Sequence, residues 1–130
     1  MNGGYVEYYE NGDIKCSAYY KNGKLEGNCL TYYENGSVKC STHYENGKLE
    51  GRYLAYYENR NIKVDFKHKA GVLHGEYLEY YENGIRKCST HYENGKLEGK
   101  YVEYSENGNI AKTTLYSKGI LISVKKGIWC

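Results

Sequence analysis

Short stretches in which apolar and polar residues alternate follow one another along the chain, and turn sequences separate them. The first two stretches are residues 5–9, YVEYY, and residues 14–20, IKCSAYY. Alternation of this kind is typical of β-strands. The turn sequences lie alternately 11 and 13 residues apart, which leaves room for short strands but for no helix. The pattern therefore predicts a series of β-hairpins.

The hairpins repeat with a period of 24 residues, and no insertion interrupts the spacing. The first turn of a copy carries Tyr-Glu-Asn-Gly, as at residues 33–36, and the second carries a sequence such as Glu-Asn-Gly at 45–47. This repeat predicts an all-β fold, a single elongated, curved antiparallel sheet of about ten strands. The predicted copies are residues 3–26, 27–50, 51–74, 75–98 and 99–122, followed by a C-terminal capping strand and tail at 123–130.

The first turn admits two registers. A two-residue Asn-Gly loop pairs Tyr9 with Ile14, whereas a three-residue Glu-Asn-Gly loop pairs Tyr8 with Ile14. We favour the second, because it sets apolar opposite apolar residues and gives Gly12 the left-handed position of a G1 bulge. Its further pairs are Glu7–Lys15, Val6–Cys16, Tyr32–Val38, Leu30–Cys40 and Leu54–Val64. Arg86 opposite Tyr80 and Lys112 opposite Val102 break the pattern and suggest local slippage or an end effect.

The second turn predicts a two-residue loop, which pairs Glu45 with Lys48 and Tyr44 with Leu49. If that register continued, Leu54 would face the wrong side of the sheet. One extra residue restores the alternation, and the glycine near the start of each copy is the candidate for a β-bulge. These glycines are Gly27, Gly51, Gly75 and Gly99.

Tyrosine supplies much of the apolar surface, with 18 residues in the chain. Alternation assigns two columns to an inner face: Tyr8, Tyr32, Tyr56, Tyr80 and Tyr104, and Tyr20, Tyr44, Tyr92 and Tyr116 with His68 in the gap. Large rings on the opposite face suit partner binding, because they lose little rotamer entropy. The candidates are Tyr5, Tyr9, Tyr33, Tyr53, Tyr57, Tyr77, Tyr81 and Tyr101. The alternative is that these rings shield their own sheet, packed against Lys and Glu stems.

The histidines and serines do not form a recognisable catalytic or metal-binding arrangement. Ser41 with His43, and Ser89 with His91, lie two apart on one strand face, but no repeated carboxylate orients either imidazole. His68 and His74 flank a turn, and their spacing gives no support for metal ligation. We therefore predict a protein that is not an enzyme and that has no cofactor and no metal.

The five cysteines do not predict a disulfide framework, because their number is odd and none forms a Cys-x-x-Cys pair. Cys16, Cys40 and Cys88 occupy one repeat position, so neighbours lie roughly 9–10 Å apart, beyond disulfide reach. We interpret them as small apolar residues of a buried column. Cys29 and Cys130 are expected to be exposed thiols.

The net charge of +2 is too small for counterion-driven nucleic-acid binding. A membrane span is not expected, since there is no apolar run of about 18 residues or more. The first four residues, MNGG, do not begin a signal peptide. A cytoplasmic location is therefore the default expectation, and a secreted or surface-associated one holds if a signal segment was removed.

The motif Gly-x-Tyr-x-x-Tyr-Tyr-Glu-Asn-Gly, followed by Tyr-Glu-Asn-Gly-Lys-Leu-Glu-Gly, resembles the bacterial variant of the MORN repeat. The resemblance covers residues 3–122 in five tandem copies. It implies an elongated sheet of hairpins and an interaction role, and it supplies no catalytic residues. Related bacterial chains are often labelled antitoxin-like or uncharacterised. The better-known eukaryotic form is richer in glycine, so its membrane attachment transfers poorly.

Copy three departs most from the consensus, which indicates either a specific contact or drift. The departures are Arg60, Asp65, Phe66, Lys67, His68, Lys69, Ala70 and Val72. At the first strand, an uncovered edge leaves two alternatives, a homodimer through the sheet edges or a preceding segment.

The predicted function is non-enzymatic protein–protein interaction through a tyrosine-rich sheet face. The resemblance implies inhibition of a toxin or similar effector as its specific version. A secreted or surface-associated host-interaction (virulence) factor is one alternative. A scaffold that binds phospholipid surfaces is another, which Lys125 and Lys126 support weakly.

Overall fold

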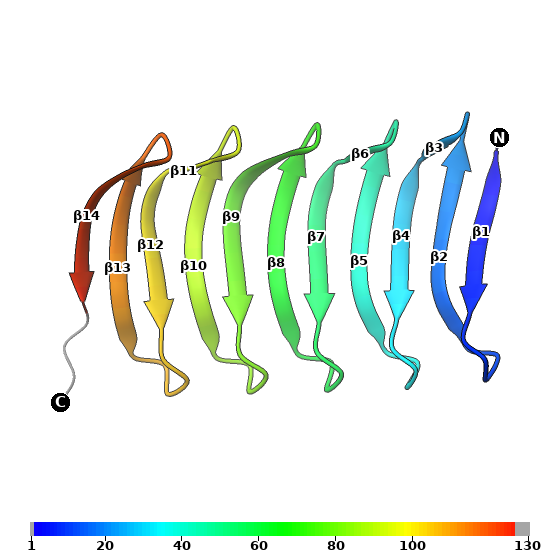
Figure 1. Cartoon of the computed structure of the whole chain (residues 1–130), viewed down its shortest axis with the longest axis horizontal. Coiled ribbons are helices and arrows are strands. Elements are labelled where there is room, and N and C mark those ends of the chain that lie inside the picture. Colours follow the sequence, from blue (N-terminus) through cyan, green and yellow to red (C-terminus); the bar gives the residue numbers. More distant parts are fainter. Residues whose placement is uncertain (1, 127–130) are drawn as a thin grey trace.

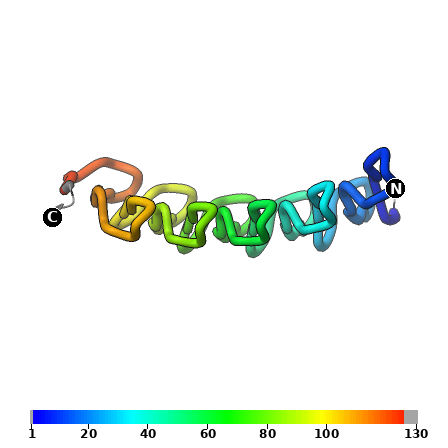
Figure 2. The backbone as a smooth tube through the Cα atoms, turned by 90° about the horizontal axis from the view of Figure 1, so that it is seen from below, coloured from blue at the N-terminus to red at the C-terminus, as the bar shows by residue number. Residues whose placement is uncertain are grey.

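The computed structural model describes residues 2–126, which form one open antiparallel sheet that is a single layer thick (Figures 1 and 2). No helix occurs in this part of the chain. The strands of the described residues are β1 (Gly3–Tyr8), β2 (Ile14–Lys21), β3 (Lys24–Leu25), β4 (Gly27–Tyr32), β5 (Val38–Glu45), β6 (Lys48–Leu49), β7 (Gly51–Tyr56), β8 (Ile62–Lys69), β9 (Val72–Tyr80), β10 (Arg86–Glu93), β11 (Lys96–Leu97), β12 (Gly99–Tyr104), β13 (Ile110–Ser117) and β14 (Ile120–Lys126). The predicted all-β fold of consecutive hairpins is confirmed.

The strands lie beside one another in chain order, from β1 at one edge to β14 at the other (Figure 1). The two-residue strands β3, β6 and β11 pair with the strand before their turn and lead into β4, β7 and β12. In copy three, the corresponding segment is the continuous strand β9. Since sequential hairpins touch only their neighbours, the fold is a linear array.

The first turn of each copy is a three-residue loop, as predicted. The amide of Gly12 donates to the carbonyl of Tyr9 at 2.9 Å, and the amide of Tyr9 donates to the carbonyl of Asp13 at 2.8 Å. The side-chain oxygen of Asn11 accepts the amide of Asp13 at 2.9 Å, and Gly12 has a φ of 93°. The signature asparagine and glycine are therefore explained by the loop, which needs a nearby acceptor and a left-handed residue.

A β-bulge beside this loop changes the register of the rest of the hairpin. Tyr8 pairs with Ile14, as predicted, but Glu7 pairs with Cys16, so Lys15 is the extra residue. The predicted pairs Glu7–Lys15, Val6–Cys16, Leu30–Cys40, Leu54–Val64 and Lys112–Val102 are therefore wrong. Arg86 and Lys112 share the register of the other copies, opposite Tyr80 and Glu103, and show no slippage.

The second turn is the predicted two-residue loop. Glu45 pairs with Lys48, and the loop residues Asn46 and Gly47 have φ angles of 52° and 81°. Two left-handed residues in succession are the requirement of a type I′ turn, whose twist matches that of the strands it joins. The Asn-Gly dipeptide meets this requirement at least strain.

The break that follows the second turn is wider than expected. β5 pairs Tyr44 with Leu49 and Ser41 with Leu54, so residues 42–43 lie opposite residues 50–53. The break thus adds two residues rather than one. Glycine does occupy it with a positive φ, as at Gly51 (80°). The other copies place Gly27, Gly75 and Gly99 there, also at positive φ.

The sheet has almost no core. Among the described residues, Cys88 is the one buried apolar residue, and the buried polar residues are Ser37, Thr42, Thr90 and Thr114. The accessible surface is 8603 Å², whereas a globular monomer of this mass exposes roughly 7,000 Å². Contacts between adjacent strands must therefore stabilise the fold.

Hydrogen bonds also join the second turns of successive copies. The amide of Gly47 donates to the carbonyl of Leu25 at 2.9 Å, and the same bond joins Gly71 to Leu49, Gly95 to Leu73 and Gly119 to Leu97. The carboxylate of Glu26 accepts the amide of Asn46 at 3.1 Å, and that of Glu98 accepts the amide of Lys118 at 3.2 Å. The recurring Lys-Leu-Glu-Gly segment thus supports the turn of the next copy.

Arg60 occupies the first-turn position that glycine holds in the other copies, with a φ of 76°. A side chain in this conformation costs about 1 kcal/mol relative to glycine. We expect Arg60→Gly to raise the free energy of unfolding by about 1 kcal/mol in urea denaturation. Gly84→Arg, at the same position of copy four, should lower it by a similar amount. A less stable Arg60→Gly protein would show that contacts of the Arg60 side chain outweigh the strain.

Candidate functional site

The tyrosines are divided between the two faces differently from the prediction. Ring pairs join Tyr5 to Tyr20, Tyr77 to Tyr92 and Tyr101 to Tyr116, with centroids 6.4, 5.8 and 6.4 Å apart. The candidate tyrosines therefore share a face with the Tyr20 column, because the bulge shifts the second strand by one residue. We call this the aromatic face: Tyr5, Tyr9, Tyr33, Tyr53, Tyr57, Tyr77, Tyr81 and Tyr101 with Tyr20, Tyr44, Tyr92, Tyr116, Phe66 and His68.

The other predicted inner column, formed by Tyr8, Tyr32, Tyr56, Tyr80 and Tyr104, does not share this face. Tyr8 is separated from Tyr5 by an odd number of positions on β1, so its side chain points to the opposite side. It is 62% exposed rather than packed in a core. The prediction that this column and the Tyr20 column form one inner face is therefore wrong.

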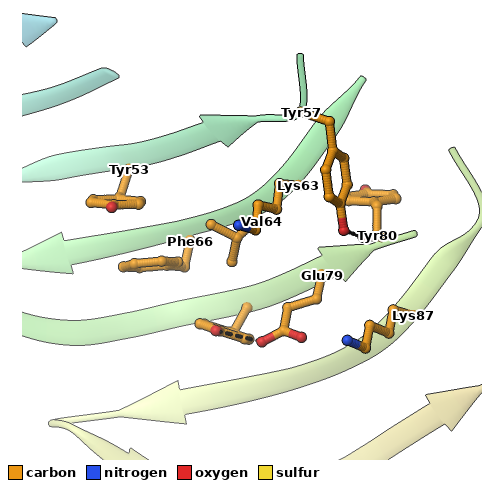
Figure 3. Close-up of a pocket in the computed structure, with 9 residues that line it drawn as sticks. Tyr53, Tyr57, Lys63, Val64, Phe66, Glu79, Tyr80 and Lys87 are labelled. Atoms are coloured by element: carbon orange, nitrogen blue, oxygen red, sulfur yellow. Dashed lines mark hydrogen bonds between the residues drawn. The ribbon is translucent and has the colours of Figure 1, made fainter. Parts of the chain in front are cut away.

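Three stacked rings form the centre of the aromatic face. Phe66 of β8 pairs with Tyr53 of β7 and Tyr77 of β9. The Tyr53 and Phe66 centroids lie 4.5 Å apart with an interplanar angle of 13°, and those of Phe66 and Tyr77 lie 5.0 Å apart at 24°. Figure 3 shows Tyr53 and Phe66 side by side on neighbouring strands. His68 adds an edge contact to Phe66 at 5.1 Å.

This stack depends on copy three. The positions equivalent to Phe66 are Ala18, Thr42, Thr90 and Thr114, which are too small to stack on a tyrosine. Sequence reasoning counted Phe66 among the departures of copy three but did not assign it to a site. A signal was present, because Phe66 is the one phenylalanine of the chain and replaces a small residue at a fixed repeat position.

A shallow hollow of about 290 Å³ adjoins the stack (Figure 3). Its charged residues are Lys63, Lys87 and Glu79, and the hydroxyl of Tyr77 donates to Glu79 Oε1 at 2.7 Å. The remaining lining residues are Tyr53, Tyr57, Val64, Phe66 and Tyr80. The hollow therefore combines aromatic surface with charges of both signs.

The first-turn tyrosines also hold successive copies together. The hydroxyl of Tyr33, which follows β4, donates to the carbonyl of Tyr56 at the end of β7 in the next copy, at 2.6 Å. Tyr9, Tyr57 and Tyr81 make the same bond to the carbonyls of Tyr32, Tyr80 and Tyr104. A lysine ammonium also lies over each of these rings, 5.7 or 5.8 Å from its centroid. The pairs are Lys15 with Tyr9, Lys39 with Tyr33, Lys63 with Tyr57 and Lys87 with Tyr81. These four candidates therefore have a structural role whatever they bind.

Three phenol groups of the aromatic face, those of Tyr53, Tyr77 and Tyr101, have raised pKa values. A hydrogen bond to Cys40, together with burial, raises the pKa of Tyr53 to about 12. Burial likewise raises the pKa of Tyr77 and Tyr101, and Cys88 contributes at Tyr101. These three residues consequently present neutral hydroxyl groups at neutral pH.

The cysteines are free thiols wherever the structure describes them. Cys88 is buried, Cys16 and Cys40 are half-buried, and burial raises the pKa of all three, which disfavours the reactive thiolate. Cys29 is also half-buried, so the expectation of an exposed thiol is wrong there. Cys130 lies outside the described residues.

The two Ser-His pairs lie on the opposite face, where each histidine has a carboxylate nearby. Nε2 of His43 lies 3.9 Å from Glu45 Oε1, and Nε2 of His91 lies 3.7 Å from Glu93 Oε1. Sequence reasoning missed these carboxylates, which follow each histidine by two residues. Both distances exceed a hydrogen bond, so neither carboxylate orients the imidazole as a catalytic base requires.

No group of three metal-ligating side chains occurs within residues 2–126. Within the same residues, no helix is present that is long and apolar enough to cross a membrane.

A family model described as MORN repeat variant matches the chain at four segments, residues 1–22, 25–46, 73–94 and 97–118. The segments keep the 24-residue spacing, and residues 47–72 between them remain unmatched. That interval contains most of copy three, which nevertheless forms the same hairpin. No curated protein matches the chain.

Removing one inter-copy hydroxyl tests the structural role of the first-turn tyrosines. Tyr33→Phe leaves the carbonyl of Tyr56 without this donor, so we expect the free energy of unfolding to fall by about 1 kcal/mol. Tyr19→Phe changes an exposed ring on the opposite face and should leave stability unchanged. Urea denaturation of both variants measures the difference. Equal effects would rule out a special role for the Tyr33 hydroxyl.

His68 occupies the position that tyrosine holds in the other copies. Burial lowers its pKa below 6.5, and its Nδ1 has no hydrogen-bond partner among the described residues. Since the unfolded chain then binds a proton more readily than the folded one, stability declines as pH falls below 6.5. We expect His68→Tyr to lose less stability than the parent between about pH 7.5 and pH 5. The measurement is the midpoint temperature of thermal unfolding at each pH. An equal decrease of this temperature in the parent and in His68→Tyr would contradict this account.

Proposed function

Because the chain belongs to the MORN repeat variant family, whose repeats generally serve as protein- or membrane-interaction modules, we propose that it binds a partner protein through its aromatic face. The stacked rings of Tyr53, Phe66 and Tyr77 carry this proposal. Stacking fixes the three rings before a partner arrives, so little rotamer freedom is lost on binding.

The mixed charge of the aromatic face favours a protein over a lipid surface. Lys63 and Lys87 stand beside Glu79 in the hollow, and the carboxylate of Glu7 accepts the hydroxyl of Tyr5. An anionic membrane selects clustered lysines without carboxylates among them. Rings, hydroxyls and charges of both signs instead match the composition of protein interfaces.

Binding by this face also supplies a mechanism for inhibition. A single-layer array is long, and its rings lie in a row along one face, half-buried except for the exposed Tyr5. Such a face covers an extended strip of a partner. Covering that strip blocks whatever the partner does there, without any chemistry from the array. Within the proposed class, inhibition of a toxin or similar effector is the specific form that we propose. It rests on the resemblance to bacterial MORN-repeat chains, and the extended face is compatible with it.

Photo-crosslinking from the two faces tests this function. p-Benzoylphenylalanine replaces Phe66 on the aromatic face or, as a control, Leu78 on the opposite face, and each protein is incubated with lysate of the native host. We expect one partner, identified by mass spectrometry, to be crosslinked from position 66 and not from position 78. Crosslinking of the same protein with equal yield from both positions would contradict the proposal.

A substitution drawn from the repeat itself provides the quantitative test. Phe66→Thr installs the residue of copies two, four and five and removes the central ring, so we expect the captured partner to bind about tenfold more weakly. Leu78→Thr makes the matched change on the opposite face and should leave affinity unchanged. Circular dichroism verifies that both variants fold, and an unchanged affinity of Phe66→Thr would exclude the stack as the binding determinant.

A further inference from the structure

The first turns of neighbouring copies differ in how they pack. At two junctions, the side chain that follows the first-turn glycine position reaches toward the same position of the next copy, whereas no atom lies within 4 Å of a Cβ built at Gly36. Asn61 Nδ2 lies 3.8 Å from where a Cβ of Gly84 would be, and Ile85 Cγ2 lies 4.0 Å from where a Cβ of Gly108 would be. These two junctions are therefore filled by the preceding residue.

The junction between copies two and three is open instead. Ser37 takes the place of Asn61 and Ile85, and its hydroxyl donates to Asn35 Oδ1 at 2.6 Å. Ser37 is 6% exposed, so it forms the floor of the junction. At the glycine position of the next copy stands Arg60.

A hollow of about 340 Å³ results at this junction. It is lined by Gly36, Ser37, Val38, Tyr56 and Arg60. Val38 and Tyr56 supply apolar surface, and Arg60 is the one charged residue of the lining. The hollow lies on the face that carries the Tyr8 column, to which Tyr56 belongs, and this face is opposite the aromatic face. The site is therefore independent of the function proposed above.

Arg60 is retained there against the conformational preference of its backbone. Its φ of 76° is in the same left-handed region as the φ of the glycines at this position. Its amide donates to the carbonyl of Tyr57 at 2.9 Å, which is the bond that those glycines make in their own turns. Strained non-glycine residues cluster at binding sites. No ion pair joins the guanidinium of Arg60 to another side chain within residues 2–126.

We propose that this hollow binds a carboxylate carried on an apolar body. The planar guanidinium of Arg60 presents a fork of donors that matches the two oxygens of a carboxylate. The apolar part of the ligand rests against Val38 and the ring of Tyr56. Either a free organic acid or a glutamate side chain of a partner supplies this chemistry.

Nuclear magnetic resonance titration with 3-phenylpropionate tests the site, and the neutral 3-phenylpropanamide serves as its control. We expect saturable shifts of the Ser37, Val38 and Arg60 amides with the acid only. Arg60→Gln should weaken binding about tenfold, because it removes a charge-assisted bidentate contact. Arg86→Gln, which removes an exposed arginine outside the hollow, should not change it. Saturable binding of acid and amide with equal affinity, or an acid affinity that Arg60→Gln leaves unchanged, overturns the proposal.

A second titration distinguishes the two sources of the carboxylate. It uses the peptide acetyl-Ala-Glu-Ala-amide and its Gln counterpart in place of the acid. Saturable binding of the Glu peptide alone assigns the hollow to a partner side chain, whereas binding of phenylpropionate alone assigns it to a free acid. If neither probe saturates, the hollow is not a carboxylate site.

Arg60→Gly separates binding from folding in the same assay. Glycine relieves the left-handed strain but removes the guanidinium, so we expect loss of phenylpropionate binding in a protein at least as stable as the parent. A variant that loses binding because it unfolds would also lose stability, which the denaturation curve reports. Retained binding in Arg60→Gly overturns the role of Arg60.

Discussion

The absence of a second layer across residues 2–126 is the constraint on which the rest of this structure depends. A sheet covered on neither face cannot be stabilised by a core, and among the described residues only Cys88 is a buried apolar side chain. Each strand must therefore be held by its two neighbours. The repeat signature meets this need, because its tyrosine, its asparagine and its Leu-Glu-Gly segment all form hydrogen bonds within a turn or to the next copy.

The hairpins could be predicted from sequence because they depend on local chemistry. Asn-Gly supplies the left-handed residues that a tight turn needs, and alternation of apolar and polar residues predicts strands. An unbroken period predicts a linear array of hairpins. The faces could not be predicted, because the bulge at Lys15 and its equivalents is marked by no glycine or proline. One unmarked residue reverses which side chains share a side of the sheet. The eight candidate tyrosines stayed together, whereas the Tyr8 and Tyr20 columns were separated.

Copy three shows that substitutions at repeat positions change the surface of one copy while its hairpin fold is kept. Phe66 replaces a small residue and completes the ring stack on one face, while Arg60 replaces glycine and bounds a hollow on the other side. Both side chains are accommodated because an open sheet leaves space above each position. The hairpin geometry is kept, since the loop bonds of residues 57–61 match those of the other copies. Sequence reasoning located the departures but not the surfaces that they form.

The hydrogen bonds between strands all point along the length of the array, since the strands lie across it (Figure 1). A pulling force applied between β1 and β14 therefore loads these bonds in series, and it opens one strand pair before the next. We therefore expect the array to lengthen by one strand pair at a time rather than to resist until it fails as a whole. This expectation follows from the same single layer that leaves the aromatic face without a covering layer.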